Sequence, residues 1–315
     1  MSKEIKNLSA SLQARLVARA KREGQTPDQV FYYYALERFL YRLYQSPHGK
    51  SFVLKGGLMF FGWGLPLRRP TRDIDLQGYT INTIENLTAI IREVCQFPVE
   101  PADGMLYDLA SIHGEDITND ADYHGVRISV QSQLGHIPIP LQVDVSFANQ
   151  ITPHAIAAEY FTLLGMPTFT VRGYPYEMTI AEKFQAMVVL DMVNDRLKDF
   201  YDLWLISRQF EIQGPVLVEA ITNTFRARHT AIPNKIPTAL TEGFAAEKQK
   251  GWAGFIKKLP KSDDVPAEMM QVLLVLQEFL LPPMTAAALQ ADFASTWRSD
   301  QGWRPRLSLR PRSFC

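Results

Sequence analysis

The sequence predicts an α+β protein with two N-terminal helices, a strand-rich middle and a mostly helical C-terminal region. Three observations support this fold class. Apolar residues recur at helical spacing in residues 9–43, apolar and polar residues alternate in segments between 99 and 147, and helical spacing returns after about residue 176. With 315 residues, 46% of them hydrophobic, the chain is long enough for two folded domains.

The two N-terminal helices have clear ends. Leu12 and Leu16 lie on one helical stripe, and Gly24 closes the first helix. The second helix begins with the capping-box pair Thr26 and Gln29 and a proline between them, and it extends to about residue 43. "SPHGK" then ends it.

The middle of the chain alternates between strands and one helix. Residues 51–64 indicate a strand or a strand–helix unit, 73–79 a second strand and 82–95 a helix. "GVRISVQSQL" and "IPLQVDVSF" alternate as half-buried strands do, so Asp144 projects from the polar face of its strand. Further on, the capping-box spacing of Thr179 and Glu182 begins a helix, and "KDFYDLWLIS" forms another.

Composition excludes several classes of protein. No apolar run approaches the roughly 18 residues that a membrane span requires, and the N-terminus lacks the apolar core of a signal peptide, so we expect a cytoplasmic protein without a membrane partner. Cys95 and Cys315 indicate neither a disulfide framework nor a zinc site. The net charge is zero, but residues 221–315 carry 13 Lys and Arg against 8 Asp and Glu, so this part is +5 and the remainder −5.

A pair of aspartates is the first candidate for chemistry. Asp73 and Asp75 lie two residues apart on a predicted strand, so their carboxylates share one face and repel each other unless a cation lies between them. Mg²⁺ binds one or two carboxylates together with substrate phosphates and water. Taken alone, the pair is better explained as an exposed acidic turn. Asp144 adds a third carboxylate if its strand crosses the sheet beside Asp75.

Two glycines precede the aspartates. Gly56 and Gly57 follow the apolar segment "FVL", and without a Cβ they let backbone N–H groups approach a triphosphate closely. A strand-to-helix turn that needs a permissive backbone is the alternative explanation. Lys55 beside them either helps to bind phosphate or is a surface lysine.

The later helices carry further candidates. With Thr179 as N-cap, Lys183 is the fourth residue of its helix, where a cation opposes the helix dipole. This indicates either a compensating anionic ligand, such as a nucleotide phosphate, or a snorkelling lysine. Asp199 and Asp202 share one helix face and either meet the lysine or a metal, or form a solvated acidic face.

Arginines accompany these residues. Arg68, Arg69 and Arg72 either contact phosphates or an RNA backbone, or neutralise the acidic residues. Residues 297–315 hold five arginines and two tryptophans. This composition is typical of base stacking and phosphate contact, of a disordered tail, or of a segment that docks a partner.

The order of these motifs resembles the AbiEii/AbiGii nucleotidyltransferase toxin family, which includes the MenT-type toxins, over about residues 7–207. The segments that carry the resemblance are "LERFLYRLYQSPHGKSFVLKGGLMFF", "RRPTRDIDL", "DGMLYD", "YHGVRISVQSQLG", "IPLQVDVSF", "TIAEKFQAMVVL" and "RLKDFYDLWLIS". It implies a minimal nucleotidyltransferase fold, a mixed sheet flanked by helices, in residues 1–176, followed by a helical domain in residues 177–315.

The resemblance also implies roles for single residues. The first family motif falls on Gly56, Gly57 and Thr71, which with Lys55 would bind the nucleotide, and it ends on the aspartate pair 73 and 75. The other motifs fall on the aspartate at 144 and the lysine at 183, and the fourth falls on the aspartate at 199, with that at 202 as the alternative. All of these acidic residues and the lysine would be catalytic, Asp73, Asp75 and Asp144 would bind Mg²⁺, and Lys183 would also bind the nucleotide.

A function follows from the family. The resemblance implies a magnesium-dependent toxin of a type IV toxin–antitoxin system, often a phage-defence module, that transfers a nucleotide from an NTP to the 3′ end of tRNA and has a cognate antitoxin as partner. The chain departs from the family in two places: "SFAN" stands after Asp144 where "GFGD" is expected, and the C-terminal third has no matching motif. The spacing between Gly57 and Asp73 is longer than in generic members of the superfamily, but relatives within the family share such an insertion.

Two other interpretations stay open. The same fold would transfer nucleotides to a small molecule or to a protein hydroxyl, which the zero net charge favours over an RNA acceptor. Alternatively, the chain is a non-catalytic nucleotide-binding or interaction module.

Overall fold

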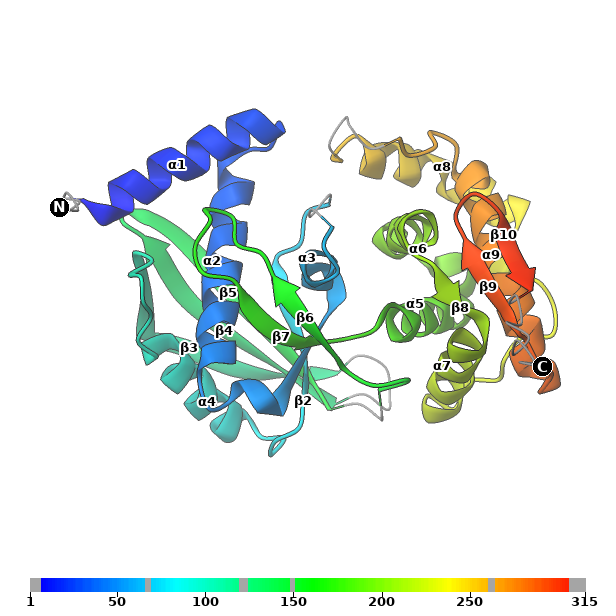
Figure 1. Ribbon diagram of the computed structural model, residues 1–315, viewed down its shortest axis with the longest axis horizontal. Coiled ribbons are helices and arrows are strands. Elements are labelled where there is room, and N and C mark those ends of the chain that lie inside the picture. The colour runs from blue at the N-terminus through cyan, green and yellow to red at the C-terminus, as the bar shows by residue number, and fades with distance from the viewer. Residues whose placement is uncertain (1–6, 66–68, 119–123, 148–150, 260–263, 306–315) are drawn as a thin grey trace, which may run out of the picture. The chain divides into compact units, whose positions relative to one another are not determined.

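Figure 1 shows the computed structural model, which describes residues 7–65, 69–118, 124–147, 151–259 and 264–305. The chain divides into two compact units. The first comprises Met1–Gln150 and Ala155–Tyr174, and the second comprises Ile151–His154 and Pro175–Cys315. The short segment Ile151–His154 therefore belongs to the second unit, although in the sequence it precedes the last part of the first unit.

A mixed sheet forms the frame of the first unit. Over the described residues it has seven strands in the order β3-β4-β5-β2-β1-β7-β6. The strands are β1 (Phe52–Lys55), β2 (Asp73–Gly78), β3 (Met105–Thr118), β4 (His124–Leu134), β5 (Ile137–Ser146), β6 (Ile156–Tyr160) and β7 (Phe169–Gly173). The pairs β2–β5 and β1–β7 are parallel and the other neighbours are antiparallel. The mixed sheet that the sequence predicts is confirmed.

The two faces of this sheet differ in polarity. On β5, Leu141, Val143 and Val145 are buried, whereas Gln142 and Asp144 between them are half-buried and polar. The alternation of the sequence thus places one face of the strand in the core and leaves the other free for polar side chains.

Helices cover the apolar face. They are α1 (Leu8–Glu23), α2 (Pro27–Gln45) and α4 (Ile84–Gln96), and Figure 1 shows α2 lying across the strands. The capping box of Thr26 and Gln29 is formed in both directions, and Gly24 ends α1 in the left-handed conformation at φ 66°. The two predicted N-terminal helices are confirmed. Between β1 and β2, the short helices η2 (Gly56–Leu58) and α3 (Met59–Gly62) continue the chain.

Two strands of the sheet were not expected from the sequence. β6 and β7 have five residues each and pair with each other, and β7 also pairs with β1, which is far away in the chain. Strands this short carry only a few alternating positions, so their pattern is weak. The partner that stabilises β7 is invisible to a local reading of the sequence.

The second unit is mostly helical, as predicted. Its helices of more than one turn are α5 (Tyr176–Leu190), α6 (Leu197–Gln209), α7 (Gly214–Ala227), α8 (Glu242–Ile256) and α9 (Met269–Leu289). A small antiparallel sheet of β8 (Ile212–Gln213), β9 (Ser295–Arg298) and β10 (Gly302–Pro305) was not expected.

The start of α5 corrects one prediction. The N-cap is Pro175, and Thr179 lies within the helix, buried, instead of capping it. Tyr176 and Glu177 already have helical conformation, and an acidic residue in the first turn suits the positive end of the helix dipole. Lys183 is therefore in the middle of α5, where the dipole argument for an anionic ligand no longer applies.

The C-terminal tryptophans correct another interpretation. Trp297 is buried and its indole N–H donates to the carbonyl of Ser207 at 2.7 Å, while that of Trp303 donates to Phe279 at 3.0 Å. Both rings pack against Phe279 in the core of the second unit. They are therefore structural residues and not free platforms for base stacking. Residues 306–315, with three of the five arginines, lie outside the described residues.

Helix α9 is long and apolar, which corrects the expectation that no apolar stretch of the chain approaches the length of a membrane span. Among the described residues it alone meets the length and composition of a membrane span, with a mean hydropathy of 1.7 over its most apolar window. Half of that window is buried inside the protein, and Phe279 and Leu280 are fully buried. A helix buried to this extent contributes to the core of the second unit.

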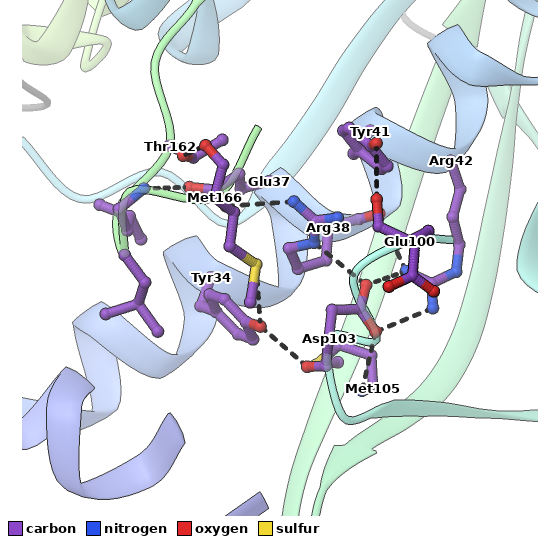
Figure 2. Close-up of polar contacts among 12 residues, drawn as sticks. Tyr34, Glu37, Arg38, Tyr41, Arg42, Glu100, Asp103, Met105, Thr162 and Met166 are labelled. Atoms are coloured by element: carbon purple, nitrogen blue, oxygen red, sulfur yellow. Dashed lines mark hydrogen bonds and ion pairs between the residues drawn. The ribbon is translucent and has the colours of Figure 1, made fainter. Parts of the chain in front are cut away.

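A buried ionic cluster attaches two loops to α2 (Figure 2). Arg38 and Arg42, one helical turn apart, both donate to the carboxylate of Asp103, which also accepts the backbone N–H of Met105 at the start of β3. On the neighbouring position of α2, Glu37 accepts the backbone N–H of Leu163 at 2.6 Å. The cluster therefore fixes the chain before β3 and the loop between β6 and β7.

The two carboxylates of this cluster respond differently to burial. Burial alone would raise the pKa of Asp103, but hydrogen bonds and charge from Arg42 and Arg38 outweigh it, so the pKa is lowered. For Glu37, burial dominates over the Leu163 N–H and Arg38 and raises its pKa to about 7. Glu37 is therefore the group of this cluster that titrates near neutral pH.

We predict that Glu37 makes stability depend on pH. Because its pKa is higher in the folded than in the unfolded chain, its contribution is full below about pH 4.5 and is lost as the pH rises to about 7. Glu37→Gln should remove this loss, which is on the order of 1–3 kcal/mol, in urea unfolding measured from pH 5 to 8. Asp103 does not interfere, since its contribution is lost only at lower pH.

The control is Glu85→Gln, which changes an exposed glutamate in the first turn of α4. It should leave the pH profile unchanged. A Glu37→Gln profile parallel to that of the wild type would contradict the prediction.

Candidate functional site

The predicted site residues fall into two groups, one in each unit. In the first unit, Asp73 and Asp75 lie on one face of β2, and Asp75 is the direct cross-strand partner of Asp144 on β5. The three carboxylates therefore lie on the same polar face of neighbouring strands, which the sequence predicted for Asp144 only on condition that its strand lay beside Asp75. Like charges directly opposite each other in a sheet are destabilising, so this arrangement requires compensation.

The glycine pair approaches this face closely. Gly56 has φ +69°, and a Cβ at this position would lie 2.1 Å from Oδ2 of Asp75. At Gly57 a Cβ would lie 3.1 Å from the hydroxyl oxygen of Thr71 and 3.3 Å from Nη1 of Arg69. The backbone of Gly56 therefore lies directly against the Asp75 carboxylate, and both the turn and the close approach require glycine there.

Cations flank the two central carboxylates. Lys55 is the cross-strand partner of Asp75 on β1, and Arg127 is the partner of Asp144 on β4. Arg127 donates from Nε to Oδ1 and from Nη2 to Oδ2 of Asp144, both at 2.9 Å. Sequence reasoning missed Arg127. The alternation of "GVRISVQSQL" could have placed it on a polar face, but only the strand register shows its partner.

The arginines before the aspartates have different environments. Arg69 is buried beside Gly57, and its carbonyl accepts the hydroxyl of Tyr33 at 3.3 Å. Arg72 and Asp73 both act on the pKa of Tyr32, which burial raises. Arg68 lies outside the described residues. Arg69 therefore belongs to the wall of the glycine turn, whereas Arg72 lies near the aspartates.

In the second unit, Lys183 on α5 meets both aspartates of α6. Its Nζ lies 2.5 Å from Oδ1 of Asp199 and 2.8 Å from Oδ2 of Asp202. The two carboxylates are 2% and 1% exposed, and Nε of Arg196 lies 2.7 Å from Oδ2 of Asp199. Residues of the same unit thus compensate the charge of the lysine, and of the alternatives for Asp199 and Asp202, contact with the lysine is the one observed.

The carboxylates of the first unit fit one kind of metal better than others. Within the described residues, no three or more His, Cys, Asp or Glu side chains could hold an ion by themselves. Mg²⁺ does not need such a cage, because it binds through one or two carboxylates and takes its remaining oxygens from substrate phosphates and water. Asp73 and Asp75, with the glycine turn beside them, match this donor set.

Comparison with known proteins gives one family and several similar solved structures. Residues 38–273 match the model of the family described as nucleotidyl transferase AbiEii toxin, type IV TA system. No curated protein matches the chain.

Solved structures from Helicobacter pylori are similar to the chain. The structure described as JHP933 has 14% identity and a TM-score of 0.50, and the match covers 84% of this chain and 94% of that one. A putative nucleotidyltransferase has 15% identity and a TM-score of 0.48, with 84% and 96% covered. At these identities, the likeness to JHP933 concerns the fold alone.

We predict that Lys183 is essential for the stability of the second unit. Lys183→Met would leave two buried carboxylates without their ammonium, and removing one partner of a buried ion pair costs about 3–5 kcal/mol. Urea unfolding followed by tryptophan fluorescence measures this, since four of the five tryptophans belong to this unit. Combining it with Asp202→Asn should recover part of the loss.

Lys248→Met is the matched control. Lys248 pairs with Asp195 in the same unit at 2.7 Å, but Asp195 is 87% exposed. Breaking such a surface pair should cost no more than about 1 kcal/mol. Equal losses in the free energy of unfolding for the two lysine variants would show that the buried contacts of Lys183 stabilise the unit no more than a surface ion pair does.

Proposed function

Because the chain belongs to the AbiEii family of nucleotidyltransferase toxins of type IV toxin–antitoxin systems, we propose that it transfers a nucleoside monophosphate from an NTP to the 3′ end of tRNA, with Mg²⁺ as cofactor. The enzyme class follows from the family, whose match covers residues 38–273. Family membership also implies a nucleotide substrate and an antitoxin partner. The acceptor, the metal, a role in phage defence and a cytoplasmic location belong to the proposal.

One observation carries the assignment of the site. The carboxylate of Asp75 lies beside a glycine turn on one side and opposite Asp144 on the other. Carboxylates next to glycine backbone suit a metal-bound triphosphate. The metal would neutralise the charge of the carboxylates, and the backbone N–H groups would donate to the phosphates.

Each residue of the first unit then has a task. Asp73 and Asp75, together with Asp144 opposite Asp75, would supply the oxygen ligands of Mg²⁺. The turn at Gly56 and Gly57 brings backbone close to the Asp75 carboxylate and the Thr71 hydroxyl, and the backbone N–H groups and this hydroxyl would donate to phosphate oxygens. When bound, Mg²⁺ would neutralise phosphate charge and favour in-line displacement of pyrophosphate. Catalysis by these residues consists of positioning and charge compensation.

We propose that Lys183 binds a phosphate of the nucleotide, and that Asp199 and Asp202 orient its ammonium group. Both carboxylates already hold the ammonium at hydrogen-bond distance. Such a lysine is fixed in place before a nucleotide arrives, so its ammonium does not have to be ordered on binding. Lys55, in register with Asp75, adds a second cation on the first unit.

Label transfer tests the proposed reaction. The protein, Mg²⁺, total tRNA and each of the four NTPs labelled in the α-phosphate should give labelled RNA. Asp75→Asn should lower the rate by at least about 100-fold, since it removes a charged ligand. Asp116→Asn is the control, because Asp116 is exposed on β3 and lies in register with Val126 of the apolar face. Transfer that survives Asp75→Asn would sink the site assignment.

Two further arms identify the acceptor. Periodate oxidation destroys the 3′-terminal diol of tRNA, so oxidised tRNA should accept no label. In whole lysate, RNase treatment should remove the labelled product. Label that stays on protein or on a small molecule after RNase would favour those acceptors instead.

We predict that Gly56→Ala strongly slows transfer at a modest cost in stability. The added methyl group would collide with the Asp75 carboxylate, which can turn away because it is a side chain, but then no longer holds its position. Strain at positive φ should cost about 1–2 kcal/mol in unfolding, and the transfer rate should fall at least about 100-fold.

Gly24→Ala separates the two effects. Gly24 has nearly the same backbone angle, φ +66°, but a Cβ there would meet nothing within 4 Å. It should show the same loss of stability and full transfer activity. Equal activity in both variants would contradict the role of Gly56.

A further inference from the structure

Arg127 holds the carboxylate of Asp144 from the strand next to it. Its guanidinium faces the carboxylate side-on, with one N–H to each oxygen at 2.9 Å. The side chain of Arg127 is 33% exposed and that of Asp144 19%, so water screens the pair only in part. Gln142, two residues before Asp144, adds a weaker contact at 3.3 Å. Both oxygens of Asp144 therefore have a fixed partner on the side away from Asp75.

The pair is part of a row of charges across five strands. Glu115 on β3, Arg127 on β4, Asp144 on β5, Asp75 on β2 and Lys55 on β1 are successive cross-strand partners. The row has two adjacent negative charges at its centre and a positive charge on each side of them. Cross-strand neighbours of opposite charge stabilise a sheet and those of like charge destabilise it. Arg127 is thus placed where it offsets the repulsion between Asp144 and Asp75.

We propose that Arg127 is a positioning residue for nucleotidyl transfer, which fixes the orientation of the Asp144 carboxylate and allows it to lie beside Asp75. This inference rests on the proposed function, because it takes Asp144 as part of the reacting site. Arg127 itself touches neither nucleotide nor metal in this role. It acts through Asp144, as the outer partners of ligating groups do in metal sites.

The geometry requires arginine in particular. A planar fork of two N–H groups matches the two oxygens of a carboxylate and sets the plane of that carboxylate. Lysine would supply the charge but not the second parallel hydrogen bond. Arg127→Lys therefore separates orientation from charge, and Arg127→Gln removes both.

Binding of Mn²⁺ in the presence of a non-hydrolysable NTP analogue, measured by calorimetry, tests the proposal without turnover. Arg127→Gln should weaken Mn²⁺ binding by about 10–100-fold, the usual effect of losing such an outer partner. Arg127→Lys, which keeps the charge and the fold, should show most of this loss. Thermal melting in EDTA checks that every variant is folded.

Arg92→Gln is the matched control. Arg92 is an exposed arginine of α4, and it donates to the carbonyl of Leu109 on β3, in the same unit. It should bind Mn²⁺ as the wild type does. A mutant cycle adds the second test: in an Asp144→Asn background, Arg127→Gln should cause no further loss, because it acts only through Asp144.

The outcomes separate this inference from the function on which it rests. A wild type that binds no Mn²⁺ would overturn the magnesium-dependent function. If the wild type binds Mn²⁺ and Arg127→Gln binds it equally well or more tightly, Arg127 is a bystander or a competitor of the metal, and this inference alone is wrong. Losses that add in the mutant cycle would likewise overturn it.

Discussion

The parallel pairing of β2 with β5 is the constraint on which the rest of the first unit depends. It sets Asp75 opposite Asp144, with Asp73 one step along the same face. Two carboxylates at neighbouring positions of a sheet repel each other and destabilise it, and the residues around them reduce this repulsion. Arg127 takes both oxygens of Asp144, Lys55 stands in register with Asp75, and the lack of a side chain at Gly56 gives Asp75 its space.

In the second unit, neighbouring residues again compensate a central charge, which here is the positive charge of Lys183. Lys183 is held by Asp199 and Asp202, and Arg196 balances the remaining charge of Asp199. The lysine therefore does not need a nucleotide to explain its presence. Charge compensation inside each unit means that a ligand exchanges partners instead of meeting bare charges, so its net gain is smaller than the number of contacts suggests.

How far the sequence predicts the protein depends on whether a feature is local. The capping box of Thr26 and Gln29 and the alternation of β5 involve neighbours in the chain, and both were correct. The capping role of Thr179 was wrong because Pro175 starts the helix one turn earlier. Two features depend on contacts between separate segments, which a single sequence does not show. They are the pairing of β7 with β1 and the ion pair between Arg127 and Asp144.

The apolar core is what gives the charged row its register. Side chains alternate along a strand, so a slip of β4 by one residue would place Val126 or Ile128 opposite Asp144 and turn Arg127 toward the buried face. Val126 and Ile128 are almost fully buried beneath the helices, which makes such a slip costly. Asp103 also ties the start of β3 to α2, and β3 pairs with β4 on both sides of an irregularity between Asp108 and His113. The fit of apolar side chains thus sets the position of the Arg127 guanidinium opposite Asp144.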